Sequence, residues 1–82
     1  LLMTNIEKYN KAFMESFNIE EDKLKGLKYQ DIIDWDSVGH MQLMAELEDE
    51  FDVELDIDDI VDFSSYEEGK NILLKYEVNI DL

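Results

Sequence analysis

Three residues near the middle of the chain, Asp36, Ser37 and His40, are of the types that form a nucleophilic triad. Neighbours this close on one helix cannot make the Ser–His and His–Asp hydrogen bonds together in the geometry that a triad requires. The chain also lacks a Gly-x-Ser-x-Gly turn. We therefore expect no catalysis by the chain itself, and we interpret His40 as a half-buried packing residue.

A second set of residues with chemical potential is a run of alternating acids, namely Asp52, Glu54, Asp56 and Asp58. Such a run begins the calcium loop of an EF-hand, but that loop also requires Gly at its sixth position and Glu at its twelfth. These positions hold Ile57 and Phe63. We therefore expect no metal site, and only weak, nonspecific binding of divalent cations that relieves repulsion among the acids.

The composition narrows the possible partners. The 82 residues suffice for one small domain, expected over 1–82. With 22 acidic residues against seven lysines, the net charge is −15. This charge disfavours nucleic acid and anionic membranes and favours basic protein surfaces.

The absence of cysteine excludes disulfides and thiolate zinc sites. The apolar runs are too short to span a membrane and no secretion signal is visible, so we expect a cytoplasmic monomer.

Two capping boxes predict a first and a last helix. The segments Thr4–Glu7 and Ser65–Glu68 each place a hydroxyl residue three positions before Glu, which is typical of a helix start. They predict helices over about 4–17 and 66–77. Apolar residues recur at spacings of three and four in the first helix and predict its buried stripe as Ile6, Tyr9, Phe13 and Phe17.

The segments between the helices have no long periodic pattern. We interpret 18–36 as a loop held to the core by its apolar residues, because long connections in small domains are usually packed or functional. Residues 52–57 alternate like a strand but have no pairing partner, so we interpret them as an extended link. A short helix is expected over 58–62.

The middle helix, expected over 37–51 with Asp36 as its N-cap, has more apolar surface than its core contact needs. At about 100° per residue, one arc comprises Leu43, Met44, Leu47 and Phe51. A second apolar stripe comprises Val38, Met41 and Ala45. We expect part of this second stripe to be exposed, beside Glu48 and Asp49, as a docking surface for a basic partner.

The segment Asp36-Ser37-Val38, followed by Met41–Asp52, resembles the acyl carrier protein family. The hallmark of that family is Asp-Ser-Leu at the start of its second helix, then an apolar and acidic helix that ends in Glu-Glu-Phe. The similarity runs without a gap from Asp36 to about Leu74. It implies an all-α fold, a small bundle of three longer helices plus one short helix.

The resemblance also implies a function. Ser37 would carry 4′-phosphopantetheine, within the modification motif that it forms with Asp36. A separate phosphopantetheinyl transferase would attach the arm from coenzyme A, and the terminal thiol would carry acyl groups as thioesters between enzymes. The chain would be a carrier and not an enzyme. The partner-recognition face of the family falls on Val38, Met41, Gln42, Ala45, Glu48 and Asp49, and the partners would be acyl-loading and acyl-transferring enzymes with basic docking surfaces.

The chain departs from the family pattern near the motif. Val38 stands where Leu is usual, Gly39-His40 replaces residues that are more often acidic or polar, and Trp35 is unusual. These departures leave fatty-acid synthesis and a specialised polyketide or polysaccharide-modifying pathway open, and we favour a discrete carrier outside the main fatty-acid cycle. An aminoacyl or D-alanyl carrier is an alternative. A further alternative is an unmodified acidic helical module that binds a basic protein partner.

Overall fold

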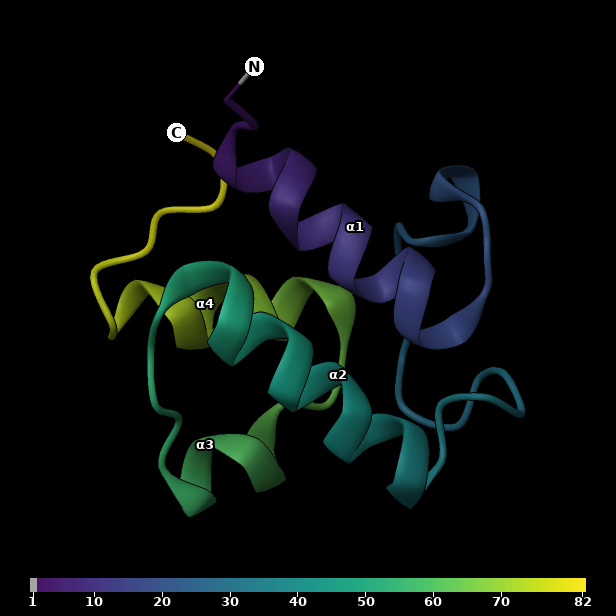
Figure 1. The fold of residues 1–82 in the computed structure, drawn as a ribbon. Helices are drawn as coiled ribbons and strands as arrows, with labels where there is room; N and C mark the ends of the chain where they lie inside the picture. The colour runs from purple at the N-terminus through teal and green to yellow at the C-terminus, as the bar shows by residue number, and fades with distance from the viewer. Residues whose placement is uncertain (1) are drawn as a thin grey trace.

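The computed structural model describes residues 2–82, and within them the only regular elements are helices (Figure 1). Their order is α1 (Asn5–Phe17), a 3-10 turn η1 (Glu21–Lys23), α2 (Ser37–Phe51), α3 (Ile57–Asp62) and α4 (Tyr66–Leu74). The predicted all-α bundle of three longer helices and one short helix is confirmed.

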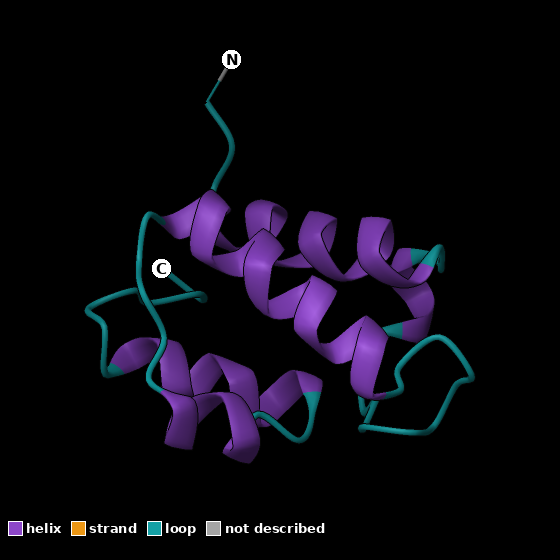
Figure 2. Ribbon diagram, turned by 60° about the horizontal axis from the view of Figure 1, so that its bottom comes forward, coloured by secondary structure: helices purple, strands orange, loops and turns teal. Residues whose placement is uncertain are grey.

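The first helix, α1, begins with the cap that the sequence predicts. The Thr4 side chain accepts a hydrogen bond from the Glu7 backbone N–H, and the Glu7 carboxylate accepts one from the Thr4 backbone N–H. Asn18 ends α1 in the left-handed conformation, with φ of 52°. The helices α1 and α2 then lie side by side and run antiparallel, so that α1 covers one face of α2 (Figures 1 and 2).

The core is aromatic and is built around the predicted stripe of α1. Tyr9, Phe13 and Phe17 are fully buried, whereas Ile6 is half-buried. The Phe13 ring contacts Trp35, with ring centroids 5.6 Å apart. Because edge-to-face aromatic pairs add to the free energy of burial, this cluster ties the loop before α2 to α1.

The loop at 18–36 is held to the core, as predicted, by three buried residues, Leu24, Leu27 and Trp35. Backbone hydrogen bonds also join it to the α3–α4 junction. The Tyr29 N–H donates to the Ser64 carbonyl over 2.9 Å, and the Tyr66 N–H donates to the Leu27 carbonyl over 2.8 Å. Ile33, in contrast, is 91% exposed and does not help to anchor the loop.

The link between α2 and α3 is extended, as predicted. Asp52 ends α2 in the left-handed conformation, with φ of 52°. No strand pairs with the following residues in the part of the chain that the structure describes. The next helix, α3, begins at Ile57, one residue earlier than expected.

The predicted end of the last helix is wrong. We expected a helix over 66–77, but α4 ends at Leu74 and turns follow. Glu77 adopts the left-handed conformation, with φ of 64°, which redirects the chain. The tail then returns to the start of α1 (Figure 1), where the Asn5 side-chain amide donates a hydrogen bond of 2.9 Å to the Asn79 carbonyl, and it buries Ile80. The free energy gained by burying Ile80 therefore favours this turn over a longer helix.

Candidate functional site

Ser37 is the first residue of α2, and its hydroxyl does not cap the helix. Asp36 is the N-cap, and its Oδ1 accepts a hydrogen bond of 2.8 Å from the Gly39 N–H. Ser37 is exposed, and its hydroxyl has no hydrogen-bond partner among residues 2–82. Because Asp36 already satisfies the helix start, the Ser37 hydroxyl is available to an external reagent.

The first turn of α2 packs closely against the preceding loop. Gly39 is buried there, and a Cβ atom at this position would overlap the backbone carbonyl oxygen of Asp34. The close approach explains why the sequence has glycine in the first helical turn, where it is otherwise unfavourable. The loop and the helix therefore hold Ser37 at a fixed point of the surface.

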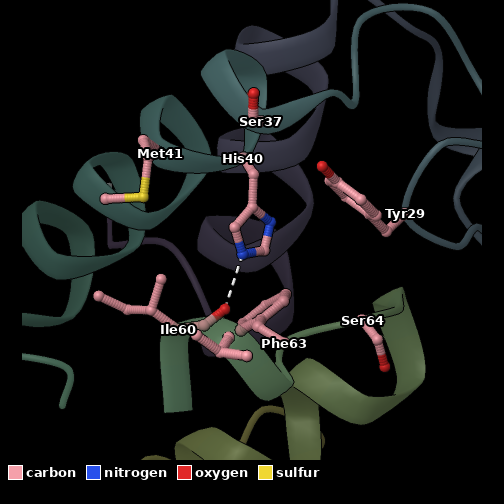
Figure 3. A pocket seen from close by; sticks show the side chains of 8 residues that line it. Tyr29, Ser37, His40, Met41, Ile60, Phe63 and Ser64 are labelled. Carbon is pink, nitrogen blue, oxygen red and sulfur yellow. Dashed lines mark hydrogen bonds between the residues drawn. The ribbon is translucent and has the colours of Figure 1, made fainter. Parts of the chain in front are cut away.

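An apolar pocket of about 370 Å³ lies beside Ser37, between α2, α3 and the loop before α2 (Figure 3). Its size is at the lower end of the range for small-molecule pockets. Its lining contains no charged carboxylate or ammonium group and comprises Tyr29, Ser37, His40, Met41, Ile60, Val61, Phe63 and Ser64. The pocket can therefore receive a small apolar group attached near Ser37.

His40 is a packing residue, as the sequence predicts. Its Nδ1 accepts a hydrogen bond of 2.9 Å from the Trp35 indole N–H, and its Nε2 lies 2.7 Å from the Ile60 carbonyl oxygen (Figure 3). Since the indole can only donate, the proton of the neutral imidazole lies on Nε2 and is donated to Ile60. Both nitrogens are thus engaged away from Ser37, which rules out a Ser–His nucleophile here.

The second apolar stripe of α2 is exposed, as predicted. Val38 is 75% and Met41 is 53% exposed, and Ala45 is also exposed. Gln42 and Asp49 lie exposed on the same helix. Their exposure provides the accessible surface that partner binding needs. Partner binding by these residues stays a prediction.

Glu48, which the sequence places on the same face, also has a structural role. It is half-buried, and its Oε2 accepts a hydrogen bond of 2.8 Å from the Leu55 N–H. One of its carboxylate oxygens therefore anchors the link to α3. A charge reversal at Glu48 would disturb this link, so Asp49 is the cleaner probe of surface charge.

The structure extends the exposed apolar surface beyond α2 to α3, a helix that was predicted but whose exposed apolar residues were not. Ile57 is 78% and Val61 is 73% exposed on α3, and Val61 also lines the pocket. Their spacing of four residues would place them on one face of a helix. This spacing could therefore have predicted an apolar face from the sequence, but the acidic residues around Ile57 and Val61 made the segment resemble a polar one.

A buried acid fixes α3 in place. Asp59 is 6% exposed, and it accepts hydrogen bonds from the Lys75 ammonium and the Tyr76 hydroxyl. These hydrogen bonds hold the pKa of Asp59 below its ordinary value. The Tyr76 hydroxyl in turn accepts a hydrogen bond of 2.9 Å from the Asp56 N–H. The wall of the pocket that α3 provides is thus tied to the C-terminal end of α4.

The start of α2 favours a negatively charged group beside it. No group of three or more His, Cys, Asp or Glu side chains in residues 2–82 is arranged to hold a metal. The N-terminus of α2, in contrast, presents unpaired N–H groups and the positive end of the helix dipole beside an accessible hydroxyl.

None of the helices in residues 2–82 combines the length and apolar character needed to cross a membrane.

Known proteins provide independent information about this site. The family model described as a phosphopantetheine attachment site matches residues 33–68, which include Ser37 and the pocket residues of α2 and α3. An acyl carrier protein of Lactobacillus johnsonii is 39% identical over 61 residues, covering 70% of this chain and 76% of that protein. No solved structure gave a significant match.

Proposed function

This chain belongs to the acyl carrier protein family, and on that premise we propose that Ser37 is the residue that carries its 4′-phosphopantetheine. The chain is a non-catalytic carrier, and the bound cofactor supplies the terminal thiol on which cargo travels as a thioester. A carrier without cysteine can therefore perform thioester chemistry, because the reactive sulfur belongs to the cofactor.

The observation that carries the assignment is the exposed and unengaged hydroxyl of Ser37 at the start of α2. Asp36 keeps this hydroxyl free by capping the helix in its place. A phosphopantetheinyl transferase would take the proton of the Ser37 hydroxyl and bond the oxygen to the phosphorus next to pantetheine in coenzyme A. The pyrophosphate bond breaks, and adenosine 3′,5′-bisphosphate leaves with the electron pair. The N-terminus of α2 then favours the resulting negative charge.

The pocket beside Ser37 supports an acyl cargo over an aminoacyl cargo. An aminoacyl group has a charged ammonium, which is costly to place in an apolar site without a carboxylate partner. No carboxylate lines this pocket. An acyl chain, in contrast, is stabilised by contact with apolar walls such as those of Met41 and Val61.

The residues around Ser37 support a pathway outside the main fatty-acid cycle. Gly39 permits a close approach to the Asp34 carbonyl, and His40 joins Trp35 to α3. Val38 also differs from the leucine usual in the family. These departures from the family pattern beside the attachment serine fit partner enzymes and cargo outside that cycle.

The exposed surface that runs from Val38 to Asp49 supports a docking role. Its apolar stripe lies beyond Ser37 along α2, and Asp49 adds negative charge at the far end. A partner enzyme with Arg or Lys side chains would be steered by the acid and then seated on the apolar stripe. This orientation would bring the active site of the enzyme to the arm on Ser37.

The attachment residue can be tested by intact mass spectrometry after incubation with coenzyme A and a promiscuous phosphopantetheinyl transferase. We expect one phosphopantetheine on the natural sequence and none on Ser37→Ala. Ser64→Ala is the matched control, because Ser64 is exposed and lines the same pocket but does not open a helix; it should be modified normally. Failure of the natural sequence with several transferases would favour the unmodified acidic module instead.

A further inference from the structure

His40 makes the one direct hydrogen bond between α2 and α3 in the described part of the chain. Its Nε2–H donates to the carbonyl of Ile60 over 2.7 Å. Ile60 lies in the last turn of α3, where carbonyl groups have no partner within the helix. The imidazole therefore supplies an interaction that α3 lacks on its own, and it sets the separation of the two helices beside Ser37.

The other side of the His40 ring is tied to the core. Its Nδ1 accepts the indole N–H of Trp35, which is fully buried. The two rings are stacked, with centroids 6.2 Å apart and planes inclined by 15°. The ring of Phe63 meets the imidazole edge to face, with centroids 6.1 Å apart. The imidazole thus lines the pocket on one side and is bonded on the other to Trp35, which does not line it.

We propose that His40 is a positioning residue that sets how far an acyl chain can enter the pocket, and thereby restricts the favoured cargo to short apolar acyl groups. This inference rests on the proposed attachment of the arm to Ser37. His40 lies one helical turn beyond Ser37 and lines the same pocket. A chain that enters beside Ser37 meets the imidazole before it meets Trp35, which does not line the pocket.

The balance of interactions explains why a chain should stop at His40. Each methylene that leaves water for the pocket improves the equilibrium constant for entry about fourfold. A chain that pushed the imidazole aside would leave the buried Trp35 N–H without an acceptor, which costs about 5- to 150-fold in the same constant. It would also break the hydrogen bond to Ile60. The next methylene therefore gains less than the displacement of His40 loses.

The test uses the modified protein loaded with a series of saturated acyl groups from acetyl to dodecanoyl, each confirmed by intact mass. For each form we measure the thermal unfolding midpoint relative to the unloaded modified protein. The midpoint should rise with chain length and level off once the pocket is full. The fluorescence of Trp35, the single tryptophan of the chain, should stay constant along the series because His40 remains against the indole.

Variants at position 40 separate pocket depth from general stability. His40→Ala should move the levelling-off to longer chains, whereas His40→Gln should keep it near that of the natural sequence. The Gln amide retains a donor for Ile60 and an acceptor for Trp35. Asp22→Asn, in the exposed turn η1 and outside the pocket lining, should leave the chain-length profile unchanged.

Three results would overturn the proposal. One is the same chain-length profile in the natural sequence, His40→Ala and His40→Gln. Another is the absence of stabilisation at every chain length. The third, which needs no variant and holds even if His40→Ala does not fold, is a shift of Trp35 emission with long chains on the natural sequence. Failure to modify Ser37 at all would be seen by mass before any melting experiment, and would count against the proposed function instead.

Discussion

One face of α2 holds Leu43, Met44 and Leu47 at no more than 1% exposure, whereas the other leaves Val38 and Met41 at 75% and 53% exposure. Both faces are apolar, and they belong to the same helix. They differ because α1 and the aromatic core cover only the first face, and a bundle of this size has no further element to cover the second (Figures 1 and 2). The apolar residues of the first face therefore stabilise the fold, and those of the second face remain accessible to partners.

The largest expected effect is on the buried face. Leu47→Ala should reduce the free energy of unfolding by about 2–5 kcal/mol, because it removes a fully buried side chain and leaves a cavity. Chemical denaturation measures this value. Modification of the remaining folded protein should be nearly unchanged, because Leu47 does not reach the exposed face. A variant as stable as the natural sequence would contradict the assignment of the core face.

Met41→Ala should have the opposite pattern. Its stability should change by less than about 1 kcal/mol, since the side chain is 53% exposed. Phosphopantetheine transfer to Ser37 should slow about tenfold in kcat/KM if Met41 is a central contact of the docking surface. Steady-state kinetics with one transferase, at matched folded concentrations, give both values. Unfolding of Met41→Ala would show that the two faces are not separate.

Asp49→Lys should have a smaller and salt-dependent effect. Asp49 is exposed on α2, and reversal of its charge should raise the KM of the transferase about threefold to tenfold at low salt, with little change in kcat. High salt should reduce the difference, because exposed charges are screened. Asp22→Lys, an equal charge change in η1, is the matched control and should leave the KM nearly unchanged. Equal effects of the two variants would indicate that only net charge matters.

The smallest expected effect concerns α3, which provides the second wall of the pocket. Asp59→Asn should lower the melting temperature near neutral pH by a few degrees, because it removes the ion pair with Lys75. The loss should be small because Lys75 is largely exposed and its ammonium is then hydrated by water. The pKa of Asp59 is lowered in the folded state by its hydrogen bonds from Lys75 and Tyr76. Its stabilising contribution is therefore complete above the unfolded pKa of about 3.9 and is lost as the pH falls through the folded pKa.

The difference in melting temperature between the natural sequence and Asp59→Asn should accordingly shrink in acid. Using the difference removes the common effect of the other carboxyl groups, which repel one another near neutral pH. Melting curves of both proteins from neutral pH down to about pH 2 measure it. A difference that stays constant to the lowest pH would contradict an ionised and paired Asp59.

The sequence predicts the local features of the fold and misses those that depend on distant contacts. The starts of α1 and α2 follow from the caps at Thr4 and Asp36, which are local signals. The end of α4 does not, because Leu74 is followed by residues that could continue a helix, and the return of Ile80 to the core decides the matter.

The candidate site shows the same division. Ser37 follows from the resemblance to the acyl carrier protein family, and the exposed stripe of α2 follows from residue types and helical spacing. The hydrogen bonds of His40 and the burial of Asp59 do not, because their partners lie five to 20 positions away and come together only in the folded chain. In the sequence Asp59 is one more acid in a crowded run, whereas in the structure it is buried, paired with the Lys75 ammonium and hydrogen-bonded by the Tyr76 hydroxyl.

The claim that the exposed face of α2 leads partner enzymes to Ser37 is tested most directly by mapping a bound enzyme on the intact protein. Isotope-labelled protein would be titrated with a phosphopantetheinyl transferase while backbone amide resonances are recorded by NMR. The account predicts that the largest changes fall on Val38, Met41, Ala45 and Asp49, with α3 next. Changes centred on the outer face of α1, with α2 unaffected, would contradict it.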